Sequence, residues 1–191
     1  MRRRLAAAAA AFAFACGPVA AAAAFDVAAL MTLLHASHPA RATFRETKYL
    51  RVLDQPVETT GELRFTPPDH LEKRSVGLNG ETLVADKDMV TIERGGRTQA
   101  LSLAQYPDIA VFVDSIRGTL AGDRALLEKA YRLSLKGTQA RWTLTLVPRD
   151  EKLTRIVKRI VITGSQAEVR RVEIDQADGD HSVMAITPAA P

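Results

Sequence analysis

The chain contains very little cysteine, and several catalytic motifs are missing altogether. Cys16 is the one cysteine among 191 residues, and it falls within the N-terminal segment described below. The rest of the chain therefore has no thiol that could form a disulfide, bind a metal or act as a nucleophile. The sequence also lacks a G-x-S-x-G elbow, a glycine-rich phosphate loop and an H-E-x-x-H pair. We expect a protein that is not an enzyme, binds no cofactor or metal, and is stabilised by its apolar core.

Excess positive charge is scarce once the N-terminal segment is set aside. The whole chain has 26 Lys and Arg against 22 Asp and Glu, but three of the arginines fall within residues 2–4, so the remainder carries a net charge of only +1. Aromatic residues make up 5% of the chain. A nucleic-acid-binding domain needs a basic face with interleaved aromatic side chains. We therefore expect no nucleic-acid partner.

Residues 1–24 have the composition of a secretory signal peptide. Three arginines form a basic start, residues 5–16 form a short alanine-rich apolar run, and an A-x-A site ends at Ala24. The run is far shorter than the roughly 20 residues that span a bilayer. Cys16 lacks the leucine that usually stands three places before a lipidated cysteine, so we expect cleavage without lipidation. The mature chain is then periplasmic, with one domain over residues 25–187 and a flexible tail over 188–191.

Apolar residues recur at helical spacing in two places. Residues 27–35 follow Asp26, a plausible N-cap, and residues 107–120 carry one apolar stripe. Gly122-Asp123 ends the second helix and begins a shorter one that reaches residue 130. Residues 151–157 fit either a short helix or part of a strand.

Elsewhere the apolar residues alternate with a period of two, which is typical of antiparallel strands with one wet face. Turn residues separate these segments every eight to ten positions. The pattern predicts an α+β fold with nine to eleven antiparallel strands and a helical pair inserted in mid-chain. The expected strands are 43–53, 61–66, 70–76, 81–86, 88–94, 97–103, 141–146, 171–175 and 181–187.

The inward-facing apolar residues allow two interpretations. They fill a packed core, or they line an apolar cavity, because one helical pair is too small to fill a sheet of this size and the space left over would accept an acyl chain. The candidate cavity residues are Phe44, Leu63, Phe65, Leu71, Ile92, Ile109, Phe112, Val113, Ile116, Trp142, Leu144, Leu146, Ile162, Val172, Ile174 and Met184.

Three groups of polar residues are weaker candidates for a site. His35 and His38 are spaced to chelate a metal, but we expect them to cap the C-terminal end of their helix. The aspartate pairs 86/88 and 178/180 fall in turns, where aspartate bonds to the local backbone. The basic residues form a solvated face or contact lipid head groups or a partner; they are Lys152, Arg155, Lys158, Arg159, Arg170 and Arg171.

Several short motifs follow one another in an order known from one protein family. ATFRE at 42–46, GELRF at 61–65 and GETL at 80–83 precede VDSIR at 113–117, LAGD at 120–123 and WTLTLVP at 142–148. Over residues 25–187 this order resembles that of the periplasmic lipoprotein carriers of the LolA family.

The resemblance implies a curved antiparallel half-barrel, closed by helices, whose apolar cavity carries acyl chains. It implies a monomer that takes lipid or lipoprotein from an inner-membrane exporter and passes it to an outer-membrane acceptor, with the helical pair 107–130 as a lid. Pro67 is a departure, because the well-studied carriers have an arginine at this position. An alternative function on the same fold is an envelope sensor that binds the periplasmic domain of a membrane protein.

Overall fold

The computed structural model describes residues 24–36, 40–77 and 80–189. The expected signal peptide lies almost wholly outside these ranges and stays a prediction. His38 and the last two residues of the expected tail also lie outside them.

Eleven antiparallel strands form one sheet within the described residues, at the upper end of the expected range. Their order is β6-β5-β4-β3-β2-β1-β11-β10-β9-β8-β7, so two meanders meet where the first strand pairs with the last. In that pairing Ala42 lies opposite Pro188 and Tyr49 lies opposite His181. The strands are β1 (Ala40–Tyr49), β2 (Val57–Thr66), β3 (His70–Ser75), β4 (Glu81–Asp86), β5 (Met89–Arg94), β6 (Arg97–Ser102), β7 (Tyr131–Thr138), β8 (Arg141–Pro148), β9 (Val157–Ser165), β10 (Glu168–Gln176) and β11 (His181–Pro188).

The helices of the described chain are α1 (Val27–His35), α2 (Pro107–Leu120), α3 (Arg124–Ala130) and α4 (Glu151–Thr154). Asp26 caps α1 as predicted, since its Oδ1 accepts a hydrogen bond from the Ala29 N–H at 2.8 Å. Asp123 caps α3 in the same way, at 2.9 Å from the Leu126 N–H. The ambiguous segment 151–157 proves to be a one-turn helix followed by the start of β9. No helix in the described part of the chain is long and apolar enough to span a membrane.

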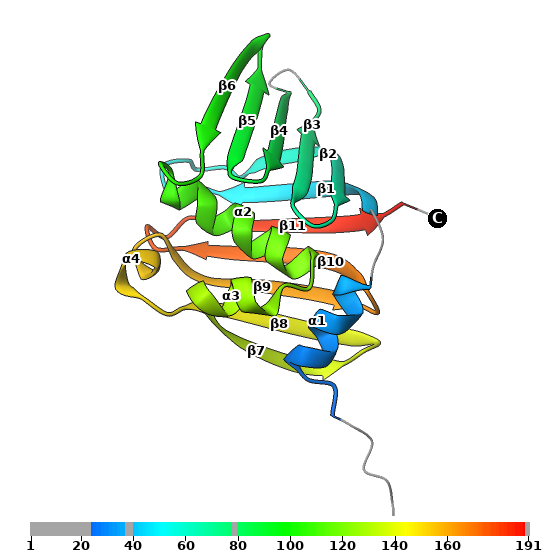
Figure 1. Cartoon of the computed structure of the whole chain (residues 1–191). Helices are drawn as coiled ribbons and strands as arrows, with labels where there is room; N and C mark the ends of the chain where they lie inside the picture. Colours follow the sequence, from blue (N-terminus) through cyan, green and yellow to red (C-terminus); the bar gives the residue numbers. More distant parts are fainter. Residues whose placement is uncertain (1–23, 37–39, 78–79, 190–191) are drawn as a thin grey trace, which may run out of the picture.

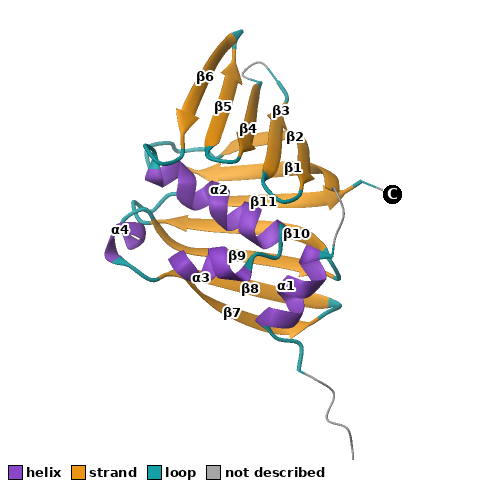
Figure 2. Cartoon of the chain, in the orientation of Figure 1, coloured by secondary structure: helices purple, strands orange, loops and turns teal. Residues whose placement is uncertain are grey.

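Helices α1, α2 and α3 lie on one face of the sheet, which we call the inner face (Figures 1 and 2). The sheet is curved but not closed, because β6 and β7 are its two edges and do not pair. Strands β3 to β6 stand at a steep angle to β1 and β7 to β11, and α2 crosses in front of the bend (Figure 1). The expected α+β half-barrel is therefore confirmed.

Gly61 lets the sheet bend where β2 meets β3. A Cβ atom on Gly61 would lie 1.9 Å from the Arg74 carbonyl oxygen and 2.9 Å from Cε1 of Phe44. Phe44 is the cross-strand partner of Gly61 and is 4% exposed. The absent side chain thus allows β3 to approach closely and leaves room for the Phe44 ring.

Two clusters of buried side chains make up the core. The larger one joins α1 and α3 to strands β7 to β10 and includes the fully buried Leu30, Leu127 and Trp142. The smaller one joins strands β4 and β5 to the start of α2 and includes Val90 and Val113. Helix α2 therefore bridges two separate cores across the bend of the sheet.

The first strand ends earlier than predicted, at Tyr49 instead of residue 53. The Arg51 N–H donates to Asp180 Oδ1 at 2.9 Å, and its guanidinium donates to the Asp178 carbonyl at 2.8 Å. These bonds hold the segment against the β10–β11 turn, so it turns instead of extending the strand. Val52 is left 89% exposed at the tip.

Candidate functional site

An apolar cavity of about 760 Å³ lies between α2 and the inner face of the sheet. Helix α2 contributes Phe112, Ile116 and Leu120, which are half-buried. Strands β1, β2, β9, β10 and β11 form the opposite wall, and residues of β3 and β4 close one side. Pockets that hold small ligands measure roughly 300–1,000 Å³, so the space is large enough for one.

Ten of the sixteen candidate cavity residues line this cavity. They belong to both meanders and to α2. Some of them pack against the larger core cluster and others against the smaller one. The ten are Leu63, Phe65, Leu71, Phe112, Val113, Ile116, Ile162, Val172, Ile174 and Met184.

The other six candidates lie elsewhere. Trp142, Leu144 and Leu146 are 0% exposed, because α1 and α3 pack directly over this part of the sheet. Ile92 and Ile109 pack against the smaller core cluster. Phe44 fills the space beside Gly61. The five strand residues face the inner side, but helices and neighbouring side chains cover them, and Ile109 lies on α2.

Several lining residues were missed at the sequence level. Ala42 and Ile186 continue the alternation of β1 and β11, so their phase could have identified them. Leu34 lies near the end of α1, and nothing in its spacing distinguishes it from the core residues of that helix. In addition to the residues at the rim of the sheet, further lining residues outside the candidate set are Leu83, Thr119, Leu120, Ala167, Val169, Glu46, Lys73, Glu168 and Ser182.

A charged pair interrupts the apolar wall. Glu46 on β1 is 6% exposed, and its carboxylate accepts a hydrogen bond from Lys73 Nζ on β3 at 2.5 Å. The same ammonium group lies 5.0 Å from the centroid of the Phe44 ring. Lys48 Nζ is 3.8 Å from Glu46 but is 44% exposed and does not line the cavity. The charges that face the cavity at this point therefore cancel.

The end of the cavity away from the Glu46–Lys73 pair opens at the rim of the sheet. Ala40, Pro188 and Ala189 line it, together with the exposed residues Arg41 and Arg64. Pro67, which stands where the well-studied carriers have an arginine, lies in the exposed turn after β2.

Helix α2 is held over the cavity by polar contacts to both meanders. Buried Tyr131 donates its hydroxyl to the Val111 carbonyl at 3.1 Å, and burial raises the pKa of that hydroxyl well above its ordinary value. The Arg117 guanidinium donates to the Lys87 carbonyl at 2.5 Å, in the turn between β4 and β5.

His35 contacts the end of a neighbouring helix. His35 Nδ1 lies 3.0 Å from the Ala121 carbonyl, so the ring caps the C-terminal end of α2. We had expected it to cap the end of its own helix, α1. Its predicted partner, His38, lies outside the described residues. No group of three or more potential ligands is found among the residues that the structure describes.

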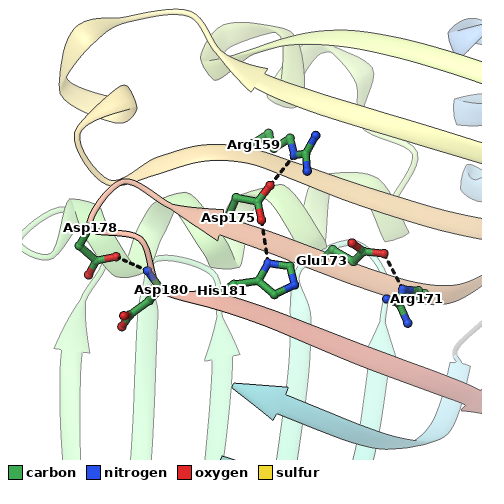
Figure 3. Close-up of polar contacts among 7 residues, drawn as sticks. All are labelled: Arg159, Arg171, Glu173, Asp175, Asp178, Asp180 and His181. Atoms are coloured by element: carbon green, nitrogen blue, oxygen red, sulfur yellow. Dashed lines mark hydrogen bonds and ion pairs between the residues drawn. The ribbon is translucent and has the colours of Figure 1, made fainter. Parts of the chain in front are cut away.

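The two aspartate pairs lie at hairpin turns, with Asp86 as the last residue of β4 and Asp88, Asp178 and Asp180 in the turn segments. Asp178 Oδ1 accepts a hydrogen bond from the Asp180 N–H at 3.0 Å (Figure 3). Asp180 Oδ1 accepts a further hydrogen bond from the Arg51 N–H. Asp86 Oδ2 is 3.7 Å from His70 Nδ1. Neither pair lines the cavity.

The basic residues of the outer face are largely paired with acidic neighbours. Asp175 contacts Arg159 and lies 2.7 Å from His181 Nδ1, while Arg171 contacts Glu173 at 2.5 Å (Figure 3). Burial alone would raise the pKa of Asp175, but the hydrogen bonds and positive charges of Arg159 and His181 outweigh burial and lower it. Arg155 and Arg170 are paired with Glu151 and Glu168.

The fold and its cavity define a class of protein: an open, helix-covered half-barrel that encloses an apolar space. The chain belongs to the family of LolA-like outer membrane lipoprotein carrier proteins, which matches it over residues 19–191. No match was found among curated protein sequences.

Three solved structures that match this chain have low sequence identity to it and TM-scores below 0.5. A LolA superfamily protein from Nitrosomonas europaea is 9% identical, with 86% of this chain and 92% of that chain covered and a TM-score of 0.44. The Mycobacterium tuberculosis lipoprotein LppX is 10% identical, with 84% and 93% covered and a TM-score of 0.46. LprF from Mycobacterium bovis is 13% identical, with 86% and 93% covered and a TM-score of 0.36. The family match alone therefore carries the assignment.

Proposed function

We propose that this protein is a non-catalytic periplasmic carrier that buries the acyl chains of a lipid or lipoprotein and transports them toward the outer membrane. The apolar cavity under α2 is the observation that supports this most directly. Membership of the LolA-like carrier family points the same way. The carrier works as a monomer between an inner-membrane exporter and an outer-membrane acceptor.

Burial of methylene groups supplies the affinity. Each methylene removed from water contributes about 0.8 kcal/mol, so affinity grows with chain length and needs few specific contacts. The apolar side chains of both core clusters and of α2 line the cavity and exclude water from a bound chain. This mode of binding also explains why the sequence carries no catalytic motif.

Helices α2 and α3 serve as the lid in this proposal. Phe112, Ile116 and Leu120 cover the cavity, and few polar contacts hold the helix to the sheet. Displacement of α2 breaks the bonds of Tyr131 and Arg117 and exposes the cavity. Cargo is then taken up or released without unfolding of the sheet.

The test is co-purification of lipid, read by native mass spectrometry of protein isolated from periplasm. Leu63→Glu places a charge in the cavity wall and is expected to abolish bound lipid. Thr66→Glu is the matched control, because it adds the same charge to an exposed position on the same strand. Circular dichroism establishes that both variants are folded. If wild-type protein never carries lipid and binds no fluorescent fatty acid, the carrier proposal fails.

The alternative, an envelope sensor, depends on a free basic outer face. Arg159, Arg170 and Arg171 each contact an acidic partner, which leaves them less available to another protein, whereas Arg155 is 79% exposed and 3.9 Å from Glu151. Loss of a membrane-protein contact on mutation of these four residues, with cavity variants unaffected, would favour the sensor.

A further inference from the structure

The cavity wall contains a polar site that acyl-chain burial alone does not explain. Glu46 and Lys73 form an ion pair there, with Glu46 6% exposed. A buried ion pair often contributes no net stability compared with apolar residues of similar volume. Apolar residues at these positions would also hold an acyl chain better. The pair therefore points to a part of the ligand that is itself polar.

Ser182 on β11, the strand next to that of Glu46, is an independent observation in the same cavity wall. It is 8% exposed and lines the cavity, and its hydroxyl has no hydrogen-bond partner among the described residues. Its Cα partner is Lys48, and Met184, two residues on, is the partner of Glu46. Ser182 and Glu46 are thus diagonal neighbours, with Cα atoms about 7–8 Å apart.

The unused hydrogen-bonding capacity of this site consists mainly of donors. An ammonium group has three N–H donors, and one of those on Lys73 is taken by Glu46. The Ser182 hydroxyl adds another donor. Oxygen acceptors on a ligand would satisfy both residues.

The ligand group is expected to be uncharged. Glu46 and Lys73 cancel each other, and Lys48, the other cation near Glu46, is 44% exposed and screened by solvent, so an added carboxylate would bring a second negative charge close to Glu46 in an apolar surrounding. A carbonyl oxygen accepts the same hydrogen bonds without this cost. Ester and amide carbonyls are the groups that join acyl chains to lipid head groups.

We propose that Lys73 and Ser182 bind the ester or amide carbonyl of an acyl lipid, and that Glu46 positions Lys73. This inference rests on the proposed carrier function and adds the class of cargo. The acyl chain then runs along β1 from Glu46 toward Ala40, a length of about 20 Å. Carbonyl-linked acyl lipids are selected over free fatty acids and over hydrocarbons.

The test uses three probes of equal chain length, methyl laurate, laurate and n-dodecane, which displace Nile red from the delipidated full-length protein. Methyl laurate is expected to bind the wild type more tightly than laurate. Selectivity is measured as the dissociation constant of dodecane divided by that of methyl laurate. In Ser182→Ala this ratio is expected to fall roughly fivefold, because the variant loses one hydrogen bond to the ester. It is expected to fall roughly tenfold or more in Glu46→Gln/Lys73→Met. Comparing ratios between variants cancels the different water solubilities of the probes.

Ser182→Ala leaves the ion pair intact, so it keeps the test decisive if the double variant does not fold. Thr187→Ala is the matched control, since it removes an exposed hydroxyl from the same strand. Unchanged ratios in folded variants overturn the carbonyl site, while dodecane binding still supports the carrier. Tighter binding of laurate than of methyl laurate also overturns it. If no probe binds, the carrier proposal fails as well.

Discussion

Replacing Ala42 by tryptophan tests whether the cavity holds an extended chain. Ala42 lines the cavity on β1, between Leu63 of β2 and Pro188 of β11. An indole at this position fills the end of the cavity near the rim and leaves the polar end at Glu46 open. The variant is therefore expected to shorten the chain that fits without removing the site.

The size of the effect follows from methylene burial. An indole is larger than three methylenes, so excluding roughly three of them is a conservative figure. At about 0.8 kcal/mol each, the loss is about 2.4 kcal/mol, or roughly sixty-fold in the dissociation constant. Short chains that end before Ala42 are expected to lose little.

The assay is displacement of Nile red by methyl esters of increasing chain length. For the wild type, each methylene is expected to tighten binding roughly fourfold until the cavity is full. In Ala42→Trp this increase should stop at a shorter chain. Thr43→Trp is the control, because Thr43 is the next residue on β1 and is exposed on the outer face. If a folded Ala42→Trp binds long esters as tightly as Thr43→Trp does, the chain does not occupy this space and the reasoning is wrong.

Two further predictions concern stability. Gly164→Ala places a Cβ atom 2.2 Å from Cζ2 of fully buried Trp142, so urea unfolding is expected to show a loss of about 1–3 kcal/mol, and an unchanged midpoint would contradict this packing. The lowered pKa of Asp175 stabilises the fold above its unfolded value of about 3.8, and this stabilisation is lost as the pH falls through the lower folded pKa. The difference in unfolding free energy between wild type and Asp175→Asn should therefore shrink below that pH, and a pH-independent difference would exclude the contribution.

The alternation of apolar residues was sufficient to predict nine of the eleven strands and the inner face of the sheet, whereas β7 and β9 were not among the expected strands. Leu63, Trp142 and Val172 were all assigned to that face, and all three lie on it. Alternation could not separate cavity from core, because the difference depends on which part of the sheet a helix covers. Trp142 lies below α1 and α3, whereas Leu63 lies where the bend holds α2 away from the sheet.

The charged wall residues were missed for a different reason. Glu46 and Lys73 occupy inward positions of their strands, but a search for apolar side chains passes over them. The alternation of β1 could have identified Glu46, because Ala42, Phe44 and Glu46 lie on the same face of that strand. Their partnership across β2 depends on Gly61 and the curvature of the sheet, which no local pattern reveals.

The pairing of β1 with β11 also determines when the protein becomes able to bind. The two strands belong to opposite ends of the chain, yet both form the cavity wall, and no other strands of the described chain join the two meanders. Contacts between such distant residues form slowly, and chains fold from the N-terminus as they are made. A chain that has been made only as far as β10 has a complete first meander but no enclosed cavity. Enclosure of the cavity is therefore the last structural step, and loss of β11 would separate the two meanders and leave the apolar wall open.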